Sequence, residues 1–148
     1  MAQTIYPKGV FLQTATIELT SNQLLHMLAS PITCIAAPGA NKIICVVNAT
    51  FYLFFGTTPY TIAGAPKLTY QNNVGFTACN LAAGIFTSAA DFIYGPATGT
   101  NLNTGSTAVT SLVNQPIVLS KTSSEMTLGD GTARLVIQYS IVDVAAAS

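Results

Sequence analysis

His26 is the one side chain in the sequence whose ordinary pKa lies near neutral pH, the range that general acid–base catalysis uses. It stands between Leu25 and Met27, and no acidic residue lies near it in sequence. We therefore expect a structural role for His26. A partner that is distant in sequence would still allow it to act as a general base.

The carboxylates form the second candidate for chemistry, because two or three converging carboxylates can hold a divalent ion or cleave a glycoside. Their spacing matches no known signature, and Asp130, between Gly129 and Gly131, has the sequence context of a turn. The sequence contains neither a Gly-x-Ser-x-Gly elbow nor a Gly-x-x-x-x-Gly-Lys phosphate loop. We expect no enzyme activity, no metal and no cofactor. The five carboxylates are Glu18, Asp91, Glu125, Asp130 and Asp143.

The cysteines and the basic residues are both widely scattered. Three cysteines are too few for a disulfide framework and too far apart for a Cys-x-x-Cys motif, so we expect small buried hydrophobic residues at Cys34, Cys45 and Cys79. Phosphate binding draws its affinity from clustered cations, so nucleic acid is not an expected direct partner. The isolated cations are Lys8, Lys42, Lys67, Lys121 and Arg134.

Charge is scarce throughout the chain. Only 7% of the 148 residues are charged, against about 25% in an average soluble domain, and five basic residues balance five acidic ones. Such a surface favours contact with other protein. The longest apolar segment, residues 43–55, is too short for a membrane helix, which needs about 20 residues, and we expect no membrane association. The first residues lack the pattern of a signal peptide, so we expect synthesis and retention in a cytoplasm.

Local patterns predict an extended arm over residues 1–15, because Tyr6-Pro7-Lys8-Gly9 breaks regular structure. A strand over 16–20 and a short helix over 21–29, capped by Ser21 or Asn22, should follow. Residues 32–36 and 42–47 are β-branched runs separated by Pro38-Gly39, which predicts a hairpin.

The second run of this hairpin continues to Phe55, so it should form a long or bent strand. Residues 67–71 read as a strand followed by a turn at Asn72-Asn73, and 76–88 as either a strand or a second short helix. Residues 95–108 are poor in large apolar side chains and predict an exposed loop.

Two closing strands are expected over 115–120 and 133–142, with residues 129–131 turning the chain between them. In the last strand, Leu135, Ile137, Tyr139 and Ile141 share one face. Seven or eight short strands without a βαβ rhythm predict one all-β domain over 16–148. Its fold should be an antiparallel sandwich or a jelly-roll-like barrel.

Aromatic side chains crowd one predicted strand. Phe51, Tyr52, Phe54 and Phe55 place rings on both of its faces, so either the core takes up both faces or a neighbouring subunit covers one of them.

Several ordered segments resemble small structural proteins of tailed bacteriophages over about residues 16–144. The segments are Ile17-Glu18-Leu19-Thr20-Ser21-Asn22-Gln23-Leu24-Leu25, Ala37-Pro38-Gly39-Ala40-Asn41-Lys42, Phe55-Gly56-Thr57-Thr58-Pro59-Tyr60, Asn114-Gln115-Pro116-Ile117-Val118-Leu119 and Leu128-Gly129-Asp130-Gly131-Thr132-Ala133-Arg134-Leu135.

The family includes capsid decoration, or cement, proteins, and the resemblance implies a homotrimer that binds the major capsid protein on the outside of the virion. Head-fibre or tail components of the same particle are the first alternative. A carbohydrate-binding β-sandwich and a polysaccharide hydrolase are alternatives of other classes. The candidate protein-interface residues are Ile5, Tyr6, Val10, Phe11, Tyr52 and Phe54.

Overall fold

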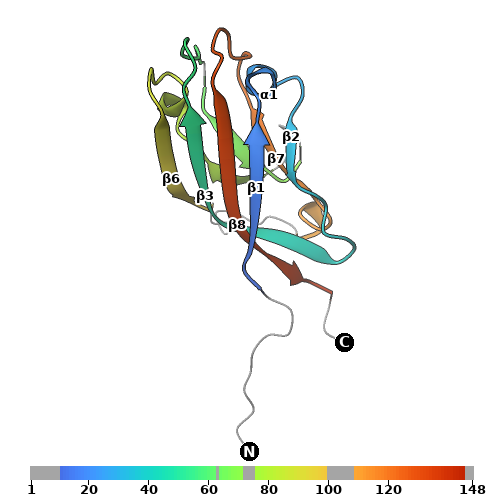
Figure 1. Ribbon diagram of the computed structural model, residues 1–148. Coiled ribbons are helices and arrows are strands. Elements are labelled where there is room, and N and C mark those ends of the chain that lie inside the picture. Colours follow the sequence, from blue (N-terminus) through green and yellow to red (C-terminus); the bar gives the residue numbers. More distant parts are fainter. Residues whose placement is uncertain (1–10, 63, 72–75, 100–108, 146–148) are drawn as a thin grey trace, which may run out of the picture.

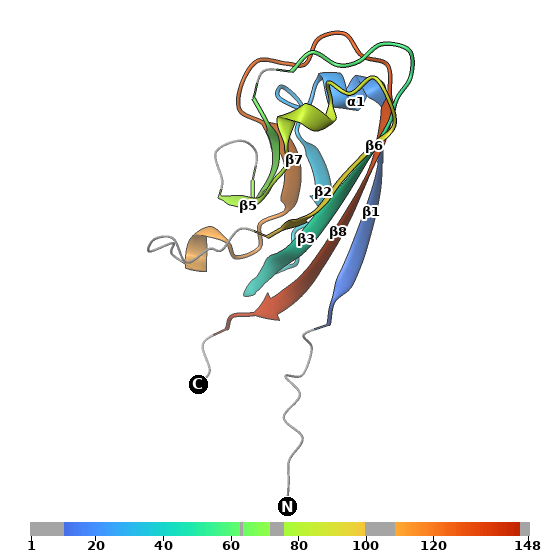
Figure 2. The same cartoon turned by 90° about the vertical axis from the view of Figure 1, so that its left-hand side faces the viewer.

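The computed structural model describes residues 11–62, 64–71, 76–99 and 109–145. In these ranges the chain forms two four-stranded antiparallel sheets that pack face to face (Figure 1, Figure 2). Both sheets are open, so the all-β sandwich predicted from the sequence is confirmed and the alternative of a barrel is not what the described strands form.

The first sheet has the strand order β1-β8-β3-β6 and the second has the order β2-β7-β4-β5. A short helix, α1, lies over one end of the sandwich (Figure 2). The elements of the first sheet are β1 (Gln13–Leu19), β8 (Thr132–Asp143), β3 (Lys42–Phe54) and β6 (Phe92–Thr98). The other elements are α1 (Ser21–Leu25), β2 (Ile32–Ile35), β4 (Pro66–Thr69), β5 (Thr77–Asn80), η1 (Ala83–Ile85), η2 (Val109–Ser111) and β7 (Ile117–Lys121).

The alternation in β8 places the core as the sequence predicts. Leu135 and Ile137 are fully buried between the sheets, and Tyr139 and Ile141 pack against the core on the same face. Burying one such large side chain stabilises a fold by about 1.5–3 kcal/mol. This face of β8 therefore anchors the centre of the sandwich.

The long strand predicted from residue 42 onward is also confirmed. β3 runs for 13 residues and pairs with β8 on one side and β6 on the other. A shift of register between Val46 and Asn48 leaves Val47 exposed. Beyond this shift, Ala49, Phe51 and Leu53 point into the core.

The hairpin predicted over residues 32–47 is wrong. β2 pairs with β7 in the second sheet, whereas β3 belongs to the first, so residues 36–41 cross between the layers. The Gly39 amide donates to Oδ1 of Asn114 at 2.9 Å, and the Asn114 amide donates to the Lys42 carbonyl at 2.8 Å. A remote loop therefore holds the crossing, although Pro38-Gly39 suits a hairpin turn equally well.

The exposed loop predicted over residues 95–108 is wrong at its start. Residues 95–98 belong to β6, where Ala97 pairs with Ala49 of β3. Pro96 lacks an amide hydrogen, and an edge strand tolerates this because one side of its backbone has no strand partner. Residues 100–108 and the turn at Asn72-Asn73 lie outside the described residues.

The N-terminal elements differ from the predictions in their boundaries. Thr20, not Ser21 or Asn22, caps α1: its hydroxyl accepts from the Gln23 amide, and Oε1 of Gln23 accepts from the Thr20 amide, which is a capping box. The helix ends at Leu25, before the predicted residue 29. Residues 13–15 of the predicted arm form the start of β1, and residues 1–10 lie outside the described residues.

The remaining predictions are met in part. Residues 76–88 contain both of the alternatives, a strand (β5) and a short 3-10 helix (η1). The closing strands are present as β7 and β8, although they lie in different sheets. The turn between them ends at Gly131, whose carbonyl accepts from the hydroxyl of buried Tyr60 at 2.6 Å.

Candidate protein interface

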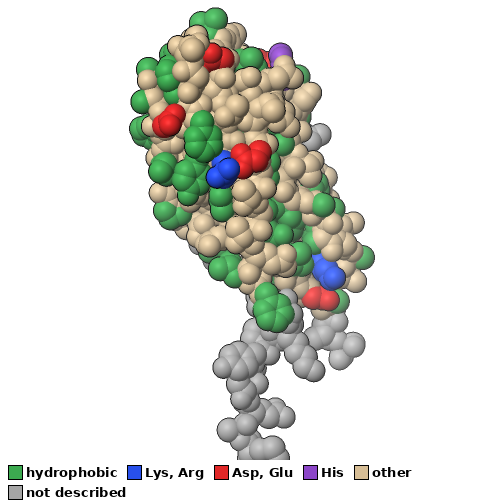
Figure 3. Space-filling view, viewed as in Figure 1, with side chains coloured by type: hydrophobic (Ala, Val, Ile, Leu, Met, Phe, Trp, Pro, Cys, Tyr) green, Lys and Arg blue, Asp and Glu red, His purple; other side chains and the backbone are tan. Residues whose placement is uncertain are grey.

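An apolar patch lies on the outer face of the first sheet, where β3 and β6 run side by side. It comprises Tyr52 and Phe54 of β3 and Ile93 of β6. Ile93 is directly opposite Tyr52 in the ladder, whereas Phe92 is opposite the inward-facing Leu53 and so points to the other face. Ile93 is 63% exposed and Phe54 39%, and Tyr52 is half-buried. Hydrophobic side chains gather on this part of the surface, beside a pair of oppositely charged groups (Figure 3).

Charged side chains border the apolar patch. Arg134 on β8 pairs with Glu18 on β1, and its guanidinium carbon lies 5.9 Å from the centre of the Phe54 ring, within cation–π range. On the other side, Oδ1 of Asp91 accepts from the Phe55 amide at 2.8 Å. The second oxygen of Asp91 makes no hydrogen bond with any described residue and so remains able to accept one.

The patch is hollowed between its two strands. A cavity of about 250 Å³ is lined by the three patch residues together with Leu53, Asp91 and Phe92. Aromatic and aliphatic walls with one carboxylate at the edge are suited to an apolar side chain that carries a nearby cation or hydrogen-bond donor.

The structure brings together two of the six residues predicted for the interface, Tyr52 and Phe54. Phe11 lies elsewhere, immediately before β1, where it is 72% exposed and its neighbour Leu12 is 60% exposed. The other three predicted residues, Ile5, Tyr6 and Val10, lie outside the described residues.

Ile93 was missed as an interface residue because β6 was not predicted. A signal was present, since Phe92-Ile93-Tyr94 is a run of residues with high strand propensity bounded by Gly95-Pro96. Read as a strand, this run would have placed alternate side chains on opposite faces of a sheet.

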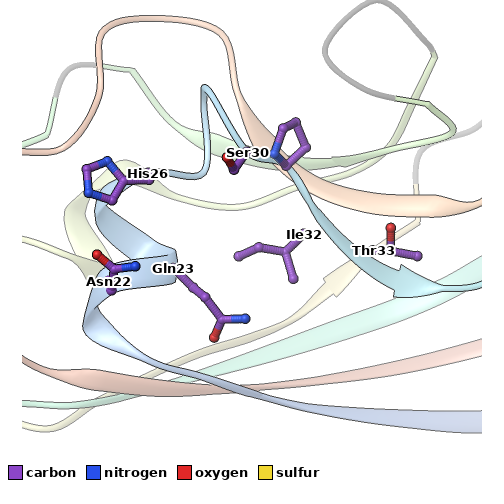
Figure 4. A pocket seen from close by; sticks show the side chains of 7 residues that line it. Asn22, Gln23, His26, Ser30, Ile32 and Thr33 are labelled. Carbon is purple, nitrogen blue, oxygen red and sulfur yellow. The ribbon is translucent and has the colours of Figure 1, made fainter.

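A second hollow, of about 440 Å³, lies beside α1 (Figure 4). Asn22, Gln23 and His26 of the helical segment line one side, and the chain from Ser30 to Thr33 lines the other (Figure 4). No carboxylate lines this hollow, and the His26 imidazole makes no hydrogen bond with a described residue. The hollow offers amide, hydroxyl and imidazole groups, and the absence of catalysis stays a prediction.

The Glu125 carboxylate fixes the backbone of the segment that follows α1, and the buried Lys121 lies in the same loop region. Glu125 accepts from the amides of Leu28 and Ala29, at 3.1 and 2.7 Å. Lys121, fully buried at the end of β7, donates to the Ser124 carbonyl at 2.6 Å. Loss of hydration lowers the pKa of Lys121, and the Glu125 carboxylate opposes this shift.

The five carboxylates are used separately in the structure. Three of them, Asp91, Glu125 and Asp130, accept backbone amides of loops distant in sequence. Glu18 pairs with Arg134, and Asp143 accepts from the Ala145 amide. Within the described ranges, no three histidine, cysteine or acidic side chains come together as a group that could hold a metal ion.

Asp130 acts over a longer distance than a turn aspartate. Its carboxylate accepts from the Thr57 hydroxyl and from the amides of Thr57 and Thr58. These residues lie 73 and 72 positions before Asp130, so the carboxylate joins two loops that are distant in sequence. The Thr57 hydroxyl contributes most to lowering the pKa of Asp130, and the two amides add to it. The predicted role in a turn is thus extended to a clamp between loops.

Because the pKa of Asp130 is lower in the folded state, its contribution to stability is complete above about pH 4 and is lost as the pH falls through the folded value. We expect Asp130→Asn to lower the urea midpoint at neutral pH, and its difference from wild type to shrink as the pH falls below the ordinary aspartate pKa of about 4. Asp143→Asn, which affects a single terminal amide, is the control. A difference that stays constant from neutral pH to acid would contradict this prediction.

The thiols are free and well protected. Cys79 is buried, as predicted, and its sulfur lies 3.5 Å from the carbonyls of Ala97 and Thr98, whereas Cys34 and Cys45 are half-buried. Burial raises the pKa of Cys34 to about 12 and that of Cys79 to about 11, and it also raises the pKa of Cys45. All three are therefore protonated, weak nucleophiles at neutral pH.

Together the fold and the patch define a small β-sandwich with an uncovered apolar surface. None of the described helices has both the length and the apolar character that a membrane crossing requires. No protein-family model and no curated protein matches the sequence. Among solved structures, the chain is similar to one described as "Cyanophage Pam1 capsid asymmetric unit", with 13% identity and a TM-score of 0.46. The alignment covers 95% of this chain and 91% of that chain, and a similarity at this score assigns no function.

Proposed function

We propose that this protein is a structural component of a tailed-phage virion that decorates and stabilises the capsid. It does so by assembling with itself as a homotrimer and binding major capsid protein subunits. The observation that carries the proposal is the apolar patch on a chain that has few charges with which to keep such a surface in water. The resemblance of the ordered segments to tailed-phage structural proteins supports the kind of particle.

Energetically, the role requires many weak contacts that act together. A trimer that touches several capsid subunits at once binds more tightly than one copy does, because later contacts form within an assembly that already exists. A central apolar surface with charges at its border, as in the patch, is the composition of such an interface. Placement on the exterior of the head, with synthesis in the host cytoplasm, is part of the proposal.

The test uses phage heads produced without this protein. We expect the purified wild-type protein to cosediment with these heads and to raise the temperature at which they release DNA. The Ile93→Lys variant, whose substitution lies in the patch, should bind at least tenfold more weakly. Heads that neither bind the wild-type protein nor gain heat resistance would contradict the proposal.

A carbohydrate-binding module is the second candidate, favoured by the aromatic side chains and the Asp91 carboxylate around one hollow. Labelling virions with antibody against the protein separates this function and the head-fibre or tail alternatives from decoration. Decoration predicts label over the whole head surface, whereas a tail component predicts label at one end. Glycan-array binding that is lost in Tyr52→Ala would favour the carbohydrate function.

A further inference from the structure

We propose that the apolar patch binds residues 5–12 of a second copy of this chain, so that each subunit holds the N-terminal segment of its neighbour. This inference rests on the self-assembly that is part of the proposed function, and it names the two surfaces that meet.

The composition of the segment matches that of the patch. Phe11 and Leu12, at the described end of the segment, are 72% and 60% exposed, so the described part of their own subunit leaves them largely uncovered. Further out the sequence adds Ile5, Tyr6 and Val10. Two uncovered apolar surfaces on one chain are each removed from water if one copy's segment lies on the other copy's patch.

The charges are complementary as well. Lys8 is the single charged residue among residues 5–12. At the patch, Arg134 and Glu18 already neutralise each other, which leaves Asp91 as the acidic side chain without a cationic partner among the described residues. The segment thus brings one cation to the one carboxylate that can accept it.

The direction of β1 favours binding of the segment to the patch of a second copy over binding to the patch of its own copy. Glu18 faces Arg134, which faces Tyr52, so the patch is level with Glu18. Gln13 lies five residues away toward the opposite end of the sheet, about 17 Å. The chain before Gln13 therefore enters β1 from the end remote from the patch (Figure 1).

Eight extended residues span about 28 Å, enough to reach across a neighbouring sheet face. A contact between two different surfaces of identical subunits is heterologous, and it closes into a ring when the rotation between subunits allows. A three-membered ring is the trimer of the proposed function.

The test measures the native mass of the full chain by light scattering across a dilution series. Ile93→Lys places a charge in the patch, and Phe11→Glu places a charge in the segment. Each variant alone should shift from a trimer to a monomer. Mixed in equal amounts, they should form dimers, because one intact segment can still meet one intact patch. Both substituted side chains are more than 60% exposed, so each variant should keep the wild-type circular dichroism spectrum.

Leu128→Lys is the matched control, since Leu128 is 65% exposed in a loop outside the patch, and it should leave the mass unchanged. A wild-type trimer that survives Ile93→Lys would overturn the inference and leave self-assembly intact. Loss of the trimer in Ile93→Lys but not in Phe11→Glu would show that the patch binds some other part of the neighbour. Failure of the mixture to form dimers would overturn the exchange of segments. If the wild-type protein were a monomer at every concentration, both the exchange of segments and the homotrimer would be contradicted. Binding to phage heads is measured by the separate cosedimentation experiment.

Discussion

Gly129→Ala is expected to destabilise the fold by about 2–5 kcal/mol. Gly129 has a φ of +89°, a left-handed conformation that costs other residues about 1–2 kcal/mol. A methyl group at this position would also lie 2.2 Å from the ring of Tyr60, which is buried and bonded through its hydroxyl to Gly131. Forcing extra atoms into a packed site costs about 1–3 kcal/mol more.

Gly39→Ala separates these two contributions. Gly39 has a φ of +103°, and an added methyl group there would meet no atom within 4 Å. This variant should therefore show the conformational part alone, about 1–2 kcal/mol. Urea unfolding of both variants measures the difference between their losses of unfolding free energy. Equal losses would show that the Tyr60 ring moves aside without lowering stability.

Phe51→Ala should reduce the free energy of unfolding by about 3–5 kcal/mol. Phe51 is fully buried on the inward face of β3, and its ring meets that of Phe86 edge to face with the centres 5.0 Å apart. Phe86 in turn contacts Tyr60, with ring centres 6.1 Å apart. Truncation would leave a cavity at the first member of this aromatic series, which links β3 to the loops at the end of the sandwich.

Phe54→Ala is the matched control, because it is the same substitution in the same strand but on the outer face. Phe54 is 39% exposed and stacks beneath Arg134, so we expect a loss of only about 1 kcal/mol. Its larger effect should be on assembly, measured as a shift of the trimer to lower mass on dilution. The opposite ranking of the two variants in urea unfolding would mean that the faces of β3 are assigned the wrong way round.

Local patterns were sufficient to predict the fold class, the long strand β3 and the inward face of β8. Alternation of side chains in β8 is a property of neighbouring residues, so Leu135 and Ile137 could be placed in the core without knowledge of any partner strand. The scarcity of charge and the aromatic run around Tyr52 and Phe54 likewise indicated an apolar surface. The resemblance to phage proteins added the kind of particle and not the contact residues.

Strand partners and the complete patch required the tertiary structure. Pro38-Gly39 permits a hairpin, but β2 pairs with β7 and β3 pairs with β8, so the two strands lie in different sheets. Ile93 enters the patch because β6 pairs with β3 some 40 positions earlier in the sequence. Asp130 was assigned to a local turn, yet its partners are Thr57 and Thr58. The strand pairings, the place of Ile93 in the patch and the partners of Asp130 all depend on the free energy of contacts between segments far apart in the chain. Local sequence patterns carry no information about which distant segments will form these contacts.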